Sequence, residues 1–309
     1  MKAGNQTSVT EFILLGFPSS PEIQMLCFVV LLAIYILTLA TNCIIIMIVR
    51  VDSKLHSPMY FFLSNFALLE ICYITTTVPK MLSGFLIEKN IIPYRQCILQ
   101  LFCFFIFGPA ELFFLVSMAY DRYIAICYPL RYSTIMSSRL CKLLVIGSWA
   151  SGFLTSGTLT IPITQLSFCR LNAINHFFCD FLPLLKLSCS DTKASEAAFF
   201  SLSWSLVLTS LILNIVSYSY IILTILRIPS TTGRQKAFFT CASHLTVVLI
   251  FYGTVIFMYL RPAATYAFDT DKIVSLFYSV LTPLLNPLIY SLRNKDVIEA
   301  IKKTLSKIS

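Results

Sequence analysis

The sequence has little charge. Asp, Glu, Lys and Arg make up 12% of its 309 residues, whereas hydrophobic residues make up 57%. A soluble domain carries about 25% charged residues, and the mean hydropathy of +0.82 indicates that lipid is the main solvent of this chain. The net charge of +9 does not indicate nucleic acid, because the basic residues flank apolar runs and form no patch interleaved with aromatics.

The sequence also lacks the motifs of a zinc site and of a cleaved signal peptide. The eleven cysteines form no Cys-x-x-Cys pair and no zinc-type spacing, so the sequence predicts no zinc site. Most of them lie in apolar stretches, where cysteine is a small buried hydrophobic residue. There is no β alternation and no internal repeat, and residues 1–24 have no basic start followed by an apolar core, so no cleaved signal peptide is expected.

Long apolar runs between charges are the main feature that is present. A helix that crosses the hydrocarbon core, about 30 Å thick, needs about 20 mostly apolar residues. Seven runs satisfy this and predict an all-α membrane protein, a seven-transmembrane helix bundle in one domain over 1–309. The expected helices are 23–49, 57–80, 96–128, 142–165, 196–227, 236–260 and 271–292. Residues 295–308 place apolar residues at helical spacing among lysines, which predicts a short amphipathic helix on the bilayer surface.

The lysines and arginines predict an orientation. Most of them lie in the loops after the first, third and fifth runs and in the C-terminal tail, so the positive-inside rule puts these segments in the cytoplasm. The N-terminus is then extracellular, in a multi-pass protein of the plasma membrane. Asn5-Gln6-Thr7 is the only glycosylation sequon and lies on the predicted outer side, so Asn5 is the expected glycosylation site.

A series of motifs follows the predicted helix ends in order. They are LHSPMYFFLSNFALLE at 55–70, MAYDRYIAICYPLRY at 118–132, Ser-Tyr at 217–218, KAFFTCASHLTVV at 236–248 and PLLNPLIYSLRN at 283–294. The set resembles the odorant receptor family of rhodopsin-like G-protein-coupled receptors, over nearly the whole chain. The segment 259–262, Tyr-Leu-Arg-Pro, is similar to the larger, tetrapod-type class. Two residues depart from the family pattern: Thr41 stands where glycine is usual, and Glu70 where aspartate is commoner.

The resemblance implies a function. It implies a receptor, and not an enzyme, that binds a small, mostly hydrophobic odorant within the helix bundle. The receptor then activates a heterotrimeric G protein of the stimulatory olfactory type and raises cAMP. A seven-helix receptor of the same superfamily for a non-olfactory ligand is the main alternative. A polytopic transporter is disfavoured, because it would more often show inverted repeats and interrupted helices.

Four cysteines lie on the predicted outer side, where thiols oxidise: Cys97, Cys169, Cys179 and Cys189. They indicate two disulfides with three connectivities. The resemblance implies the pairs Cys97–Cys179 and Cys169–Cys189. His176 beside Cys179 has metal-ligand character, but a cysteine in a disulfide is not a thiolate ligand, so no metal is predicted there.

Two carboxylates lie inside predicted membrane helices. Counted from the helix ends, Glu70 and Glu111 fall at similar depth near mid-membrane, where ionisable groups are costly and face the bundle interior. One interpretation is a shared sodium site that favours the inactive state. The other is a pair in which at least one carboxyl is protonated, because like charges at close range raise one pKa. No other cofactor is expected.

The coupling residues implied by the resemblance lie at the predicted cytoplasmic end: Asp121, Arg122, Tyr123, Tyr218 and Tyr290. Arg122 at a helix end needs a partner, and Asp121 is adjacent. On activation the arginine of such receptors leaves its local contacts and meets the G protein, while Tyr218 and Tyr290 support it. A snorkelling arginine that only sets topology is the alternative.

An apolar, aromatic wall with a few hydroxyls is expected in the outer half of the bundle. It predicts a pocket for a small neutral ligand, although Lys80 and Arg261 near its rim would attract an acid. The residues expected to contact the ligand are Phe104, Phe105, Gly108, Ser203, Leu206, Val207, Tyr252, Val255, Tyr259 and Ser279.

Overall fold

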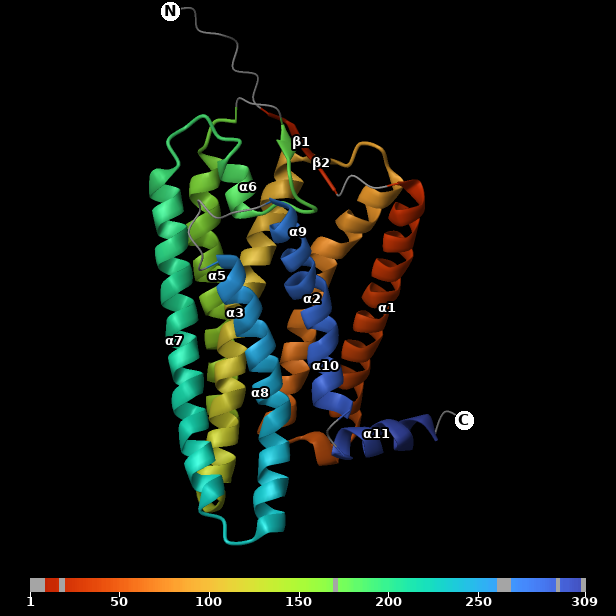
Figure 1. The fold of residues 1–309 in the computed structure, drawn as a ribbon. Coiled ribbons are helices and arrows are strands. Elements are labelled where there is room, and N and C mark those ends of the chain that lie inside the picture. The colour runs from red at the N-terminus through yellow and green to blue at the C-terminus, as the bar shows by residue number, and fades with distance from the viewer. Residues whose placement is uncertain (1–8, 17–19, 169–171, 260–267, 293–294, 307–309) are drawn as a thin grey trace, which may run out of the picture.

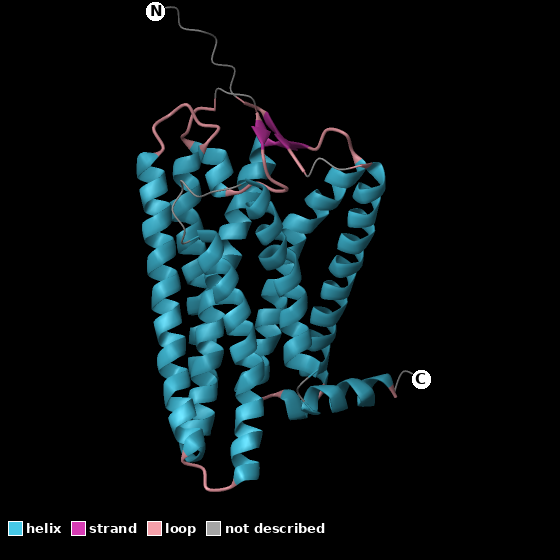
Figure 2. Cartoon of the chain, in the orientation of Figure 1, coloured by secondary structure: helices cyan, strands magenta, loops and turns pink. Residues whose placement is uncertain are grey.

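The computed structural model of the chain describes residues 9–16, 20–168, 172–259, 268–292 and 295–306. Its long helices run side by side as one bundle (Figures 1 and 2). A small β-sheet caps one end, and the amphipathic helix α11 (Lys295–Leu305) lies across the other. We refer to these as the sheet end and the α11 end.

Seven helical spans in the described residues are long and apolar enough to cross a membrane. Six are the continuous helices α1 (Pro21–Val51), α2 (Pro58–Leu86), α3 (Tyr94–Cys127), α5 (Ser138–Thr164), α7 (Lys193–Leu226) and α8 (Thr231–Tyr259). The seventh is made of α9 (Phe268–Leu276), the π-helical η4 (Phe277–Leu281) and α10 (Thr282–Leu292). Short helical turns η1 (Ser53–Leu55), η2 (Pro129–Arg131), α4 (Tyr132–Ile135) and α6 (Phe181–Leu185) lie in the connections. The predicted seven-helix, all-α fold is confirmed.

Three helices begin or end four or more residues from the expected position. Helix α2 continues through Pro79 to Leu86, α5 begins at Ser138 instead of 142, and α8 begins at Thr231 instead of 236. The π-helical turn in the seventh span was not expected. It ends just before Pro283, which has no N–H to donate, and Thr282 N–H bonds the carbonyl of Phe277, five residues back.

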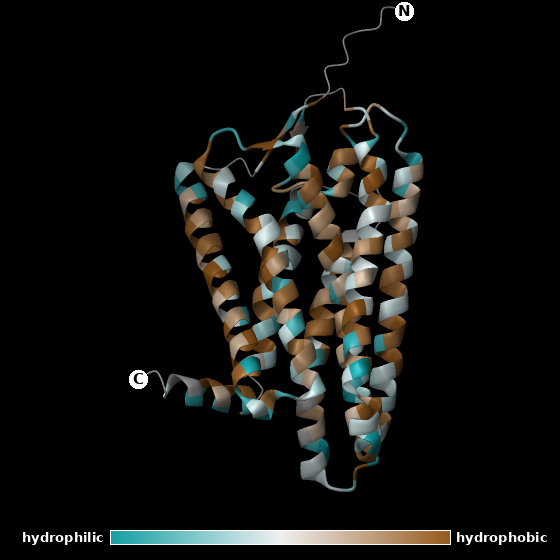
Figure 3. Ribbon diagram, turned by 180° about the vertical axis from the view of Figure 1, so that it is seen from behind, coloured by the Kyte–Doolittle hydropathy of each residue, from teal (hydrophilic) through white to brown (hydrophobic). Residues whose placement is uncertain are grey.

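Hydrophobic residues recur along the long helices (Figure 3), and many of them are exposed on the outside of the bundle. Exposed residues such as Leu26, Leu154 and Ile222 face outwards on α1, α5 and α7. Apolar residues are expected on this surface, because in a membrane it contacts lipid and not water. Helix α3 is the most buried of the seven spans, and α1 is the most exposed.

Helices α3 and α5 approach each other closely. Ser156 on α5 donates a hydrogen bond of 2.6 Å to the carbonyl of Phe102, and a Cβ added to Gly152 would lie 2.1 Å from the carbonyl oxygen of Ile106. Small residues at such positions let helix backbones pack against each other in lipid.

The sheet at the sheet end was not predicted. Strand β1 (Glu11–Leu14) pairs antiparallel with β2 (Ile91–Pro93) and parallel with β3 (Ala173–Ile174), giving the order β2-β1-β3. The described part of the N-terminal segment is therefore tied to two loops that are far from it in sequence.

Polar contacts join helix α11 to the η1 turn and to the start of α2. Lys303 pairs with Asp52 at 3.3 Å, Lys54 with Glu299 at 3.7 Å, and the Tyr60 hydroxyl donates to Asp296 at 3.1 Å. The backbone N–H of Lys54 and the charge of Lys303 hold the pKa of Asp52 below its usual value. These contacts hold α11 across the ends of α1 and α2 (Figure 1).

Candidate functional site

The loop before α6 is pinned to the top of α3. Cys97 and Cys179 form the predicted disulfide, with a Cα–Cα distance of 5.4 Å. Beside it, the Cys179 N–H donates to the Gln100 side chain at 2.9 Å, and the amide of Gln100 donates to the carbonyl of Thr76 at 2.9 Å. These contacts therefore fix the position of the loop over the sheet end of α2 and α3.

Only one cysteine of the second predicted disulfide lies in the described residues. Cys189 is disulfide-bonded, and its expected partner Cys169 lies outside the described residues, so this pairing stays a prediction. Asn5, the expected glycosylation site, also lies outside them. Among the described residues, no group of three or more His, Cys, Asp and Glu residues is arranged to hold a metal ion.

A cavity of about 70 Å³ lies inside the bundle below this loop. Helices α2, α3, α5, α7 and α8 and the π-helical turn η4 all contribute to its wall. Seven of the expected ligand contacts line it: Phe104, Phe105, Gly108, Ser203, Leu206, Val207 and Val255. The wall is apolar and aromatic with scattered hydroxyls, and it includes no charged residue among those described.

Three expected ligand contacts are placed differently. Tyr252 is buried beside the cavity wall, where its hydroxyl accepts a hydrogen bond of 3.1 Å from Asn214. Ser279 is fully buried, and its hydroxyl donates to the carbonyl of Ser275. Neither residue lines the cavity. The side chain of Tyr259 lies outside the described residues.

The residues that α2, α5 and η4 contribute to the cavity wall were not predicted from the sequence. Tyr73 and Tyr278 both pack on Phe104, with ring centroids 5.4 and 6.0 Å apart, and both line the cavity. Tyr73 lies one helical turn beyond Glu70, so its depth was available from the sequence. Tyr278 belongs to the π-helical turn, whose altered residue spacing hides its direction from a helical-wheel argument.

The cavity is smaller than the range of about 300–1,000 Å³ that ligand pockets usually have. A ligand larger than this volume would fit only if the aromatic side chains around Phe104 moved apart or α8 moved outwards. In either case, a ligand bound in the cavity would change how the surrounding helices pack.

The two membrane carboxylates converge on one amide. Glu70 and Glu111 are almost fully buried, and both accept hydrogen bonds from Nδ2 of Asn286 on α10, at 3.2 Å for Glu111. The amide supplies one donor group for two acids, which is compatible with a shared cation and with a shared proton. The sequence predicted that the two carboxyls lie at similar depth, but it did not predict that Asn286 lies between them.

Asp121 and Arg122 at the α11 end do not form the expected ion pair. Asp121 instead accepts a hydrogen bond of 2.7 Å from the hydroxyl of Tyr132 in α4. Burial and the nearby Asp121 carboxyl raise the pKa of Tyr132, so the phenol remains the donor. The reason is geometric: neighbouring residues on a helix point about 100° apart, so Asp121 reaches the loop more easily than it reaches Arg122.

Tyr218 and Tyr290 meet at a residue that sequence reasoning did not select. The Tyr218 hydroxyl and Nδ1 of His244 are 2.6 Å apart, and the His244 ring lies 6.2 Å from that of Tyr290. All three side chains are buried and within electrostatic range of Arg122. The KAFFTCASHLTVV motif contains His244, which was the available signal. Tyr123 packs elsewhere, against Tyr128 and Tyr220.

Comparison with known proteins matches the whole bundle. The family model described as "Olfactory receptor" matches residues 31–308. Olfactory receptor 8U3 of Mus musculus is 52% identical over 303 residues, covering 98% of this chain and 95% of that protein. Olfactory receptor 5P76 of Mus musculus is 48% identical, with 99% and 98% covered. Olfactory receptor 5B12 of Homo sapiens is 50% identical, with 98% and 96% covered.

Members of this family are G-protein-coupled receptors and not enzymes, which agrees with the resemblance found in the motifs. The seven apolar helices, the disulfide-pinned loop and the internal aromatic cavity are all present in one chain. The chain therefore belongs to the olfactory receptor family: it is a multi-pass, G-protein-coupled receptor of the plasma membrane.

Proposed function

We propose that this receptor binds a small, neutral, mostly hydrophobic odorant in the cavity around Phe104 and activates a stimulatory, olfactory-type G protein, which raises cAMP. The wall of the cavity supports this ligand class, because its described residues combine apolar and aromatic side chains with the hydroxyls of Tyr73, Thr155 and Ser203 and include no charged residue. One or two hydrogen bonds to these hydroxyls would orient the ligand.

The proposal rests on one observation: α8 contributes both to the wall of the ligand cavity and to the contacts around Arg122. Phe251 and Val255 line the cavity, and His244, two turns away on the same helix, contacts Tyr218. Seven residues of helix correspond to about 10 Å. A ligand that displaces the cavity face of α8 would therefore strain the Tyr218–His244 contact and free the surroundings of Arg122 for the G protein. Ligand contacts must be better in the open form, because a ligand shifts an equilibrium only by its differential affinity.

The proposed orientation places the sheet end outside the cell. Arg50, Lys54 and Arg139 lie at the α11 end, as the positive-inside rule requires of cytoplasmic loops. The Cys97–Cys179 disulfide lies at the opposite end, where an oxidising compartment would keep it. An epitope tag fused to the N-terminus should bind antibody on intact cells. Binding only after permeabilisation would reverse the orientation.

The coupling route is tested with Arg122→Ala. Agonist-evoked cAMP should disappear, while surface delivery and agonist binding stay within about twofold of the wild type. Arg139→Ala is the matched control, because Arg139 is an exposed arginine at the same end of the bundle. Normal cAMP signalling by Arg122→Ala at equal surface expression would contradict the route. An agonist response through a different second messenger would contradict the stimulatory coupling.

The ligand cavity is tested with Leu206→Trp. The larger side chain would fill the cavity and should lower agonist potency at least tenfold without lowering surface expression. Leu208 lies on the exposed side of the same helix, so Leu208→Trp should leave potency unchanged. Equal potency of Leu206→Trp and the wild type across a broad odorant panel would place the ligand elsewhere.

We also propose that Glu70 and Glu111 bind a sodium ion that favours the inactive state. Their convergence on Asn286 supports this, since two buried carboxylates are more stable with a cation between them. Replacing choline chloride by sodium chloride should raise the thermal stability of the purified wild type and not that of Glu111→Gln. An equal salt response of both proteins would favour a shared proton instead.

A further inference from the structure

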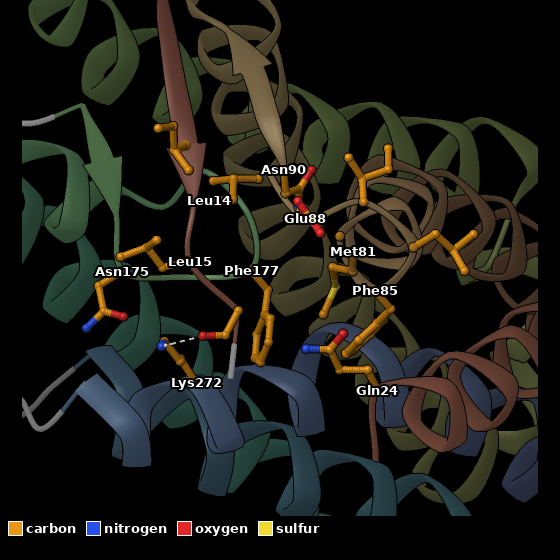
Figure 4. A pocket seen from close by; sticks show the side chains of 15 residues that line it. Leu14, Leu15, Gln24, Met81, Phe85, Glu88, Asn90, Asn175, Phe177 and Lys272 are labelled. Atoms are coloured by element: carbon orange, nitrogen blue, oxygen red, sulfur yellow. Dashed lines mark hydrogen bonds between the residues drawn. The ribbon is translucent and has the colours of Figure 1, made fainter. Parts of the chain in front are cut away.

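Two lysines at the sheet end bond the protein's own backbone. Lys272 lies in the wall of a cavity of about 780 Å³ beneath β1 and donates to the carbonyl of Gly16 at 3.1 Å (Figure 4). Lys80 on α2 donates to the carbonyl of Ile91 at 2.7 Å. Arg261, the other cation expected near the pocket rim, lies outside the described residues. Both lysines therefore have partners within the chain.

Two cavities lie beside each other at the opposite, α11 end. One, of about 530 Å³, lies between the end of α1, the η1 turn and the start of α2. The other, of about 170 Å³, lies between the start of α2 and the start of α5. His56, Ser57 and Phe61 contribute to the walls of both. We refer to the two cavities together as the Phe61 groove.

The Phe61 groove has two cations in its wall and no acid among the described residues that line it. Arg50, in the last turn of α1, lines the larger cavity, and Lys142, near the start of α5, lines the smaller one. Both side chains are exposed, and neither forms an ion pair or a side-chain hydrogen bond with another described residue. The acids around the η1 turn, Asp52 and Glu299, pair with other lysines. The groove therefore presents two positive charges without a partner in the described chain.

The larger cavity also offers free hydroxyls and an apolar wall. The side chains of Ser57 and Ser64 make no hydrogen bond with a described residue, whereas Ser117 on α3 returns its hydroxyl to a carbonyl one turn back. Ile46 and Leu68 continue the wall, and Leu68 is 46% exposed. From Ser57 to Leu68 the wall extends about 16 Å along α2. The groove therefore runs from the end of the helix well into the membrane-spanning part, which suits a molecule with a polar head and an apolar chain.

We propose that the Phe61 groove binds a phosphoinositide, a phospholipid whose headgroup carries further phosphates besides the one attached to glycerol. Arg50 binds one phosphate through two parallel N–H groups, Lys142 binds another, and an acyl chain lies on Ile46 and Leu68. Two separate cations fit two separate phosphates better than a headgroup with a single net charge. Basic pockets between membrane helices are typical headgroup sites on the cytoplasmic side. The choice of lipid therefore rests on the proposed orientation, which places the α11 end there.

The experiment uses full-length receptor in phosphatidylcholine nanodiscs that contain phosphatidylinositol bisphosphate with a diazirine in one acyl chain. Photolabelling should fall in the peptide containing residues 59–68, and unlabelled phosphatidylinositol bisphosphate should compete. Equal competition by phosphatidylserine, by cholesterol or by soluble inositol trisphosphate would overturn the proposal, because the site would then recognise net charge alone, a sterol or a free phosphate.

Charge variants test the two cations. Arg50→Gln and Lys142→Gln should each weaken labelling about fivefold, since one cation near a membrane surface contributes about this factor to the binding of an anionic lipid. Arg139→Gln is the matched control and should stay within about twofold of the wild type, because Arg139 is exposed on α5 at the same end and lines neither cavity. Equal loss in all three variants would show that the lipid responds to the overall charge of this end, and the groove would not be the site.

A second pair of variants covers the case in which Arg50→Gln does not fold. Ser57 is the N-cap of α2 and makes no side-chain cap hydrogen bond. Asp and Asn are similar in size and are equally good N-caps, so Ser57→Asp and Ser57→Asn differ mainly in charge. Ser57→Asp should weaken labelling at least fivefold by repelling the phosphates, and Ser57→Asn should stay within about twofold of the wild type.

Equal labelling of Ser57→Asp and Ser57→Asn, or labelling confined to peptides of α7 and α8, would overturn the proposal. Both leaflets of a nanodisc contain the probe, so labelling does not depend on the orientation of the receptor, on an odorant or on the G protein. Failure here would therefore leave the proposed function standing, and failure of the epitope test would leave the lipid site standing.

Discussion

The close approach of α3 and α5 leads to a sharp prediction for Gly152→Ala. The added Cβ would lie 2.1 Å from the Ile106 carbonyl oxygen and 3.0 Å from its carbonyl carbon. Cβ atoms essentially never lie closer than 3.0 Å to a heavy atom of a residue that is not adjacent in the chain, and here the obstacle is backbone, which has no rotamer to change. The two helices must therefore separate, which also stretches the Ser156–Phe102 hydrogen bond of 2.6 Å.

Overpacking of this kind costs about 1–3 kcal/mol, and losing the hydrogen bond adds about 1 kcal/mol. In an unhindered helix the same substitution is favourable by about 0.5–1 kcal/mol. Gly147 and Gly157 lie on the same helix, and a Cβ at either has no atom within 4 Å. Gly152→Ala should therefore lower stability by about 1–3.5 kcal/mol, whereas Gly147→Ala and Gly157→Ala should be neutral or slightly stabilising.

The measurement is thermal unfolding of purified receptor, followed by the reaction of buried cysteines with a fluorescent maleimide, together with surface expression of each variant. Gly152→Ala should unfold at clearly lower temperature and reach the surface poorly. If all three variants match the wild type, α3 and α5 do not meet at Gly152 and the proposed packing is wrong.

Three further changes test other parts of the structure. Cys97→Ser should destabilise the receptor by about 2–5 kcal/mol in thermal unfolding, whereas Cys27→Ser, at an exposed free cysteine, should not. Burial raises the pKa of Asp180 to about 6, above its unfolded value, so stability falls as pH rises towards 7. The advantage of Asp180→Asn over the wild type should grow by about 1 kcal/mol between about pH 5 and 7, and a constant difference would contradict this. His244→Phe removes the contact with Tyr218 and, at about 1 kcal/mol, should raise basal cAMP about fivefold at equal surface expression; unchanged basal cAMP would show that the contact does not hold the inactive state.

Local composition was enough to predict the spans. A helix in lipid satisfies its own backbone hydrogen bonds, so a sufficiently long apolar run specifies it without reference to the rest of the chain. The motifs at the helix ends then indicated the family, and the similar depths of Glu70 and Glu111 followed from counting residues along two helices. The Cys97–Cys179 disulfide came from the resemblance, because four cysteines alone leave three pairings open.

The direction of each side chain was decided by the tertiary structure. Helix rotation and tilt depend on how all the neighbouring helices pack, and a single sequence does not contain that information in readable form. This is why Asp121 bonds Tyr132 and not Arg122, why Tyr252 and Ser279 turn away from the cavity, and why the π-helical turn brings Tyr278 into its wall. Long-range pairings were equally hidden: the sequence determined that Lys272 stands at the start of the last span, and only the folded chain brings the Gly16 carbonyl to its ammonium.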